Sequence, residues 1–170
     1  MAFVPAEEGA SEVPLAASSS LAQSMAGLWA YLRESGDGDV LLIDEPEMNA
    51  HPAAQLAIAE LLAILATSGV RVVVTTHSPY MLDHLATLVE ASRLEGDARA
   101  RIVEKLQLAR DEALLEPEQL AVYRFDPDGE VTSIFDRASR TIDPATFSEV
   151  GDAETNLFSD VLAAERASGV

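Results

Sequence analysis

The sequence predicts an α/β fold in which a parallel sheet is flanked by helices. Residues 40–44, "VLLID", and residues 70–77, "VRVVVTTH", are short apolar runs of the kind that form strands buried on both faces of such a sheet. A helical segment, residues 52–69, connects the two runs and is long enough to serve as a crossover. We therefore expect a strand–helix–strand unit with the two strands parallel.

The bulk composition favours a folded, soluble chain. The length of 170 residues predicts one domain spanning residues 1–170, and a hydrophobic content of 48% predicts that the chain folds. The formal charge is −18. An acidic chain lacks the basic patch that phosphate backbones require, so we expect no direct nucleic-acid binding by this chain alone. The sequence has no cysteine, no secretory signal and no apolar run that could span a bilayer, so we expect a cytoplasmic protein without a membrane partner.

The remaining elements follow from helix caps, hydrophobic periodicity and turn residues. Pro52 and Gly69 suit the two ends of the crossover helix, and "DPDG" is a hairpin turn signal. The elements expected on these grounds are a loop or edge strand at residues 1–17, helices at residues 18–39, 78–94, 99–115 and 153–169, and a β-hairpin at residues 120–136. The helix at residues 99–115 is polar and amphipathic, which predicts an exposed position.

Polar side chains gather where the two predicted strands end. Asp44 and Glu45 close the first strand, and His77 closes the second after two threonines. Functional groups collect at this edge of parallel sheets. An acid pair alone is more often a solvated strand end, and a lone histidine is more often a structural one. Together they suit metal-assisted phosphoryl transfer: one acid holds Mg²⁺, directly or through water, the second orients or deprotonates water, and the histidine donates to phosphate.

The segments "VLLIDEPE", "NAHP" and "VVVTTHSPY" together resemble the second half of an ABC-type ATPase domain. The likeness is closest to the SMC-like and OLD-like AAA-family ATPases of bacteria. It implies a P-loop NTPase-like fold that binds ATP and Mg²⁺. Asp44 then matches the Walker B aspartate that coordinates the metal, Glu45 matches the catalytic glutamate, and His77 matches the switch histidine that contacts the γ-phosphate.

The same resemblance assigns two further motifs. Asn49 and His51 fall where the family's D-loop lies, with alanine replacing a frequent leucine between them. Ser18, Ser19 and Ser20 resemble the signature that replaces Leu-Ser-Gly-Gly-Gln, which implies that they bind a nucleotide held by another chain. A serine cluster that opens a helix can also bind an anion in its own right, or can simply cap the helix.

A Walker A motif is missing, because the one lysine, Lys105, follows no glycine-rich loop. We therefore expect a partial ABC-type domain whose nucleotide site is completed by a P-loop supplied by a partner protein or by a missing N-terminal half. Such a chain would hydrolyse ATP barely if at all when alone. The alternatives are a gene fragment or a non-catalytic interaction subunit with the same fold. A part of a Toprim-type nuclease, using Asp126 and Asp128, is less favoured because these residues fall in the hairpin turn.

Overall fold

The computed structural model describes residues 2–3, 13–14, 20–34 and 39–143, together with residues 153, 155–161, 163 and 164. The chain divides into two compact units, residues 1–119 and residues 120–170. Whether residues 1–170 form one partial ATPase domain stays a prediction.

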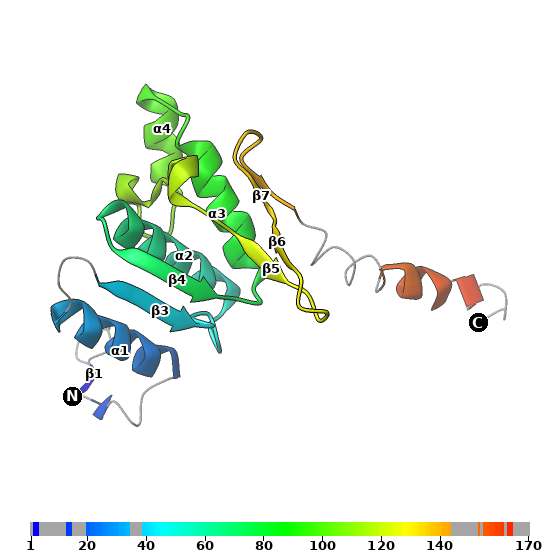
Figure 1. Ribbon diagram of the computed structural model, residues 1–170, viewed down its shortest axis with the longest axis horizontal. Helices are drawn as coiled ribbons and strands as arrows, with labels where there is room; N and C mark the ends of the chain where they lie inside the picture. Colours follow the sequence, from blue (N-terminus) through cyan, green and yellow to red (C-terminus); the bar gives the residue numbers. More distant parts are fainter. Residues whose placement is uncertain are drawn as a thin grey trace. The chain divides into compact units, whose positions relative to one another are not determined.

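A strand–helix–strand unit forms the centre of the first compact unit (Figure 1). Strand β3 (Val40–Asp44) and strand β4 (Arg71–Thr75) pair in parallel, and helix α2 (Pro52–Thr67) connects them. The register places Asp44 opposite Thr75, so both strands end at the same edge. The predicted parallel pairing is confirmed. In the described part of the chain this sheet has two strands, so a larger parallel core is not confirmed.

The ends of α2 follow the local signals in the sequence. The Nδ1 atom of His51 accepts a hydrogen bond from the backbone N–H of Ala53 at 3.3 Å, which caps the free N–H groups of the first turn. Pro52 occupies the first turn, where its missing N–H is not needed. Gly69 follows the helix with a φ of 94°, a left-handed conformation that glycine adopts without steric cost.

The core of the first unit lies on one face of the β3–β4 pair. Helix α2 packs against β4 and against helix α3 (Pro79–Ala91). The buried cluster consists of four residues from α2 and α3, and the strand residues packed against it point toward α2: Ile58, Ala59, Leu62 and Met81, with Ile43, Val72 and Val74. This burial removes apolar surface from water and orients the strands on α2.

The opposite face of the β3–β4 pair is open. Leu42 and Val73 lie opposite each other in the register and are 72% and 50% exposed. The prediction that both strands are buried on both faces is therefore wrong for the chain as the structure describes it. A continuous apolar run cannot show which face is covered, because every residue in it suits a buried position.

The helix expected at residues 99–115 is shorter than predicted. Helix α4 covers Gly96–Val103, and a short 3-10 helix follows at Asp111–Ala113. Beyond α4, residues 107 and 108 are bound by Glu60, a fully buried residue of α2 whose carboxylate accepts hydrogen bonds from the backbone N–H groups of Gln107 and Leu108 at 2.9 and 2.7 Å. These N–H groups bond to a side chain instead of helical carbonyls, so the helix cannot continue through them.

The end of the same segment is also less exposed than predicted. Ala113, Leu114 and Leu115 are buried, and the 3-10 helix packs against α2. A second 3-10 helix covers Pro117–Gln119. The periodicity that suggested one exposed helix instead belongs to α4, which has no buried residue, and to a separate 3-10 helix that packs against α2.

Helix α1 and the first strand pair agree with the expectations for the N-terminal part. Helix α1 covers Ser20–Glu34, within the range predicted for a helix. Strand β1 (Ala2–Phe3) pairs antiparallel with β2 (Val13–Pro14), as allowed by the expected loop or edge strand.

The second compact unit contains the predicted β-hairpin. Strand β5 (Tyr123–Phe125) pairs antiparallel with β6 (Val131–Ser133), and the connecting turn contains Gly129 with a φ of 90°. A further antiparallel pair, β7 (Phe135–Asp136) with β8 (Thr141–Ile142), was not predicted. Residues 155–161 are helical, within the expected final helix.

Candidate functional site

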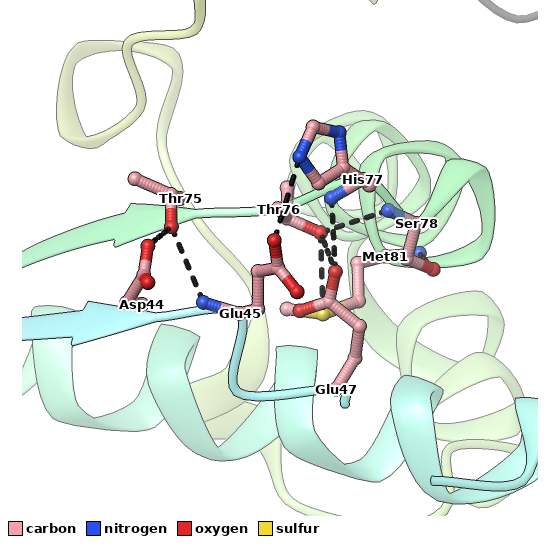
Figure 2. Close-up of polar contacts among 8 residues, drawn as sticks. All are labelled: Asp44, Glu45, Glu47, Thr75, Thr76, His77, Ser78 and Met81. Atoms are coloured by element: carbon pink, nitrogen blue, oxygen red, sulfur yellow. Dashed lines mark hydrogen bonds and ion pairs between the residues drawn. The ribbon is translucent and has the colours of Figure 1, made fainter. Parts of the chain in front are cut away.

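The carboxyl ends of β3 and β4 bring the predicted acids and the histidine together, as Figure 2 shows. Asp44 is the last residue of β3, and its Oδ1 accepts a hydrogen bond from the Thr75 hydroxyl at the end of β4. The side chain of Asp44 is exposed. Since both strands end at the same edge, this carboxylate stays at the surface while its backbone remains in the sheet.

Glu45 leaves the strand through an unusual backbone conformation. Its φ is 43°, in the left-handed region that residues with a Cβ rarely occupy. Its backbone N–H donates to the carbonyl oxygen of Thr75 at 3.1 Å and lies 3.2 Å from the Thr75 hydroxyl oxygen, which holds the residue at the strand end. Such conformations are strained and persist only where surrounding contacts hold them. They cluster at functional sites.

Glu45 and His77 face each other across the two strand ends. The His77 Nε2 and Glu45 Oε1 atoms are 3.4 Å apart (Figure 2). The imidazole is 88% exposed and the glutamate side chain 34% exposed, so both can be reached by a ligand from solvent. The contact is an ion pair only when the imidazole is protonated. In this arrangement the carboxylate of Glu45 can accept a proton, and the imidazole of His77 can donate a hydrogen bond to an anion.

A third acid, Glu47, lies beneath these two residues and was not assigned a role from the sequence. It is 7% exposed, and its Oε1 accepts hydrogen bonds from the Thr76 hydroxyl at 2.5 Å and from the backbone N–H of His77 at 3.0 Å. The signal in the sequence was the run "TTHSP", which gathers hydroxyl and backbone donors next to the histidine. Its buried acceptor could not be identified without the fold.

The two residues assigned to the D-loop occupy the turn between β3 and α2. Asn49 is exposed and has a φ of 62°, which asparagine tolerates better than most residues. His51 is exposed and caps α2. These observations explain why the turn forms, and the D-loop function of both residues stays a prediction.

The serine cluster is described at one position. Ser20 is the first residue of α1, whereas Ser18 and Ser19 lie outside the described residues. The structure therefore supports a helix start at the cluster, and its role as a nucleotide-binding signature stays a prediction.

Among the described residues, no three His, Asp or Glu side chains converge to hold a metal ion. Asp44 is nevertheless a fitting single ligand. It is exposed, it uses Oδ1 for Thr75, and its Oδ2 accepts no hydrogen bond from the part of the chain that the structure describes. Mg²⁺ keeps several waters and is bound in phosphate-transfer sites by one or two carboxylates plus substrate phosphates, so a cage of protein ligands is not required.

Comparisons with known proteins give two partial matches. Residues 6–83, which contain both strand ends, match the family described as "AAA domain, putative AbiEii toxin, Type IV TA system". The chain is 36% identical over 72 residues to the protein named "Old nuclease" from Escherichia phage P2; the match covers 40% of this chain and 12% of that protein. No solved structure gives a significant match. Over these parts of its length, the chain is therefore similar to AAA-type, OLD-like ATPases.

No helix within the described ranges is long and apolar enough to cross a membrane.

Proposed function

We propose that the ends of β3 and β4 form the metal-binding and water-activating part of an ATP-hydrolysing centre. The observation that carries this proposal is the 3.4 Å contact between Glu45 and His77, directly beside the exposed carboxylate of Asp44. The AAA-family match over the same residues supports ATP as the substrate.

The chemistry follows from the accessible groups. In ATP hydrolysis the oxygen of water forms a bond to the γ-phosphorus, and the bond from that phosphorus to the bridging oxygen of ADP breaks. Glu45 orients the attacking water and accepts a proton from it. The exposed imidazole of His77 donates a hydrogen bond to the γ-phosphate, where negative charge is concentrated. The short distance between the two side chains allows them to act on the same phosphoryl group.

Asp44 would hold Mg²⁺, directly or through a water molecule. When bound, the ion neutralises charge on the β- and γ-phosphates. The hydrogen bond from Thr75 to Oδ1 of Asp44 fixes the carboxylate, and Oδ2 accepts no hydrogen bond from the described residues.

The triphosphate itself needs a P-loop from elsewhere, either a partner protein or another part of a longer polypeptide. These 170 residues contain no glycine-rich loop ending in lysine. The exposed apolar residues Leu42 and Val73 on the open face of the β3–β4 pair favour association, because parallel strands are normally covered on both faces. The chain carries a formal charge of −18, so two copies repel each other and a more basic partner is favoured. Ser18, Ser19 and Ser20 would then contact a nucleotide held by that partner.

The test compares two glutamates that differ in position but not in charge. The chain is reconstituted with the product of the gene immediately upstream, and ATP hydrolysis and ATP binding are measured separately. We expect Glu45→Gln to lower turnover by roughly 10²–10⁴-fold while nucleotide still binds, since a positioned general base contributes about that much. The control, Glu90→Gln, changes an exposed glutamate of α3 and should have no effect.

Asp44→Asn should instead raise the Mg²⁺ concentration needed for activity. If Glu45→Gln and Glu90→Gln were equally active in a hydrolysing assembly, Glu45 would have no catalytic role. The chain would then be better described as a non-catalytic interaction subunit, which is the alternative function considered for this fold.

A further inference from the structure

Glu47 is a buried acid that the proposed chemistry does not use. It lies in the acidic turn, residues 45–50, between β3 and α2, and it is 7% exposed. A buried carboxylate is costly unless hydrogen bonds satisfy it. The groups around Glu47 therefore show which hydrogen bonds offset the cost of burying its carboxylate.

The contacts of Glu47 lead to the histidine loop, residues 76–78. Oε1 accepts hydrogen bonds from the Thr76 hydroxyl at 2.5 Å and from the backbone N–H of His77 at 3.0 Å (Figure 2). Oε2 is buried and has no hydrogen-bond partner among the described residues. The hydrogen bonds of the carboxylate therefore all go to the histidine loop, and one of them holds the backbone of His77.

A chain of hydrogen bonds closes this connection into a ring. The Thr76 hydroxyl oxygen accepts from the backbone N–H of Ser78 at 3.0 Å, and the Ser78 hydroxyl donates to the side-chain oxygen of Gln55 on α2 at 2.5 Å. The amide nitrogen of Gln55 donates to the carbonyl oxygen of Ala50 at 3.0 Å, and the N–H of Ala50 donates to the carbonyl oxygen of Glu47 at 2.9 Å. The ring ties the acidic turn to the histidine loop through α2.

The position of the imidazole depends on this ring. The His77 side chain is 88% exposed, and among the described residues its contact is with Glu45 Oε1 at 3.4 Å. An exposed side chain with one long contact is placed mainly by its backbone. The backbone N–H of His77 is bound by Glu47, so Glu47 decides where the imidazole leaves the loop.

We infer that Glu47 is a positioning residue that sets the separation between His77 and Glu45. It acts through the backbone of the histidine loop and does not touch the reacting atoms. Its consequence for hydrolysis rests on the proposed function, whereas its effect on the placement of His77 does not.

The first test is amide hydrogen exchange by NMR on the purified 170-residue chain, without ATP or partner. Glu47→Gln keeps the size of the side chain but replaces a charged acceptor by a neutral one. Because hydrogen bonds to charged groups are about twice as strong, we expect exchange at the His77 amide to become about tenfold faster relative to Val89. Val89 is fully buried in α3 and reports overall opening.

The matched control is Glu60→Gln, which alters a buried carboxylate of α2 that contacts His84, Gln107 and Leu108. It should speed up exchange at Val89 and should not make His77 faster relative to Val89. An unchanged ratio in Glu47→Gln, or the same change in Glu60→Gln, would overturn the inference.

A second variant serves if Glu47→Gln does not fold. Thr76→Val removes the hydroxyl that Ser78 uses as an acceptor but leaves the carboxylate of Glu47 in place. We expect faster exchange at Ser78 and retained protection at His77. Equal loss of protection at both amides would show that Glu47 does not hold His77.

The last measurement uses the hydrolysing assembly and a double-mutant cycle. If Glu47 acts through His77, Glu47→Gln lowers kcat about tenfold with the KM for ATP unchanged, and it has no further effect when His77 is already alanine. Additive effects of the two changes would contradict this route. Failure of the unmodified assembly to hydrolyse ATP would refute the proposed function, while the exchange data would still decide whether Glu47 positions His77.

Discussion

The left-handed backbone of Glu45 makes a sharp prediction about stability. Replacing Glu45 by glycine should give a more stable chain than replacing it by alanine. Both changes remove the same charge and the same side-chain contacts, so their difference isolates the backbone. The φ of Glu45 is 43°. In this conformation the Cβ atom lies too close to the following carbonyl oxygen, and glycine avoids the contact because it has no Cβ.

The magnitude follows from two opposing effects. A residue with a Cβ in the left-handed region costs roughly 1–2 kcal/mol, which glycine avoids. Glycine in turn costs about 0.4–1 kcal/mol more to fold because its unfolded chain has more freedom. The glycine variant should therefore be more stable than the alanine variant by roughly 0.5–1 kcal/mol, which corresponds to about 1–4 °C in Tm for a chain of this size.

Urea unfolding followed by far-UV circular dichroism measures the difference. The matched control is the same pair of changes at Asp83, an exposed position inside α3. There alanine should be more stable than glycine by about 1 kcal/mol, because the backbone is helical. The sign of the difference thus reverses between the two positions. A glycine variant at Glu45 that is less stable than the alanine variant would refute the left-handed strain argument.

Three further outcomes are expected. Glu60→Ala should lower the free energy of unfolding by about 1–3 kcal/mol, since it removes the acceptor of the backbone N–H groups of Gln107 and Leu108; Glu60→Gln should cost less, and equal urea midpoints for Glu60→Ala and the unmodified chain would contradict this. Arg99 lowers the pKa of Asp111 through a paired hydrogen bond, so the extra stability over Asp111→Asn, at most about 1 kcal/mol at this exposed site, should be present at pH 7 and disappear as the pH falls below about 4. A difference that grows on acidification would reverse that assignment. Calorimetry of the isolated chain should show weak binding of Mg-ATP at best, and tight binding would remove the need for a P-loop from elsewhere.

Much of the local structure could be predicted because its causes lie within a few residues. The β-branched and apolar runs predict β3 and β4, and Pro52 and Gly69 predict the ends of α2. The parallel pairing follows from a crossover helix of sufficient length. The convergence of Asp44, Glu45 and His77 at one edge then follows from the direction of the strands.

Contacts between distant residues could not be predicted in the same way. The helix expected at residues 99–115 cannot run through Gln107, because Glu60, 47 residues earlier in the chain, accepts the hydrogen bond of its backbone N–H. The exposure of Leu42 depends on the fact that α2 covers one face of the strand pair. No local pattern distinguishes these outcomes, because the competing interactions appear only when the elements pack.

The sequence by itself determined which segments form the two strands, where α2 begins and ends, and which acids and histidine could share a site. Only the tertiary structure decided that Glu47 is buried beneath that site and bound to the backbone of His77. The reason is that propensity and periodicity act over one or two turns of chain, whereas a buried carboxylate is stabilised by donors that other segments bring to it.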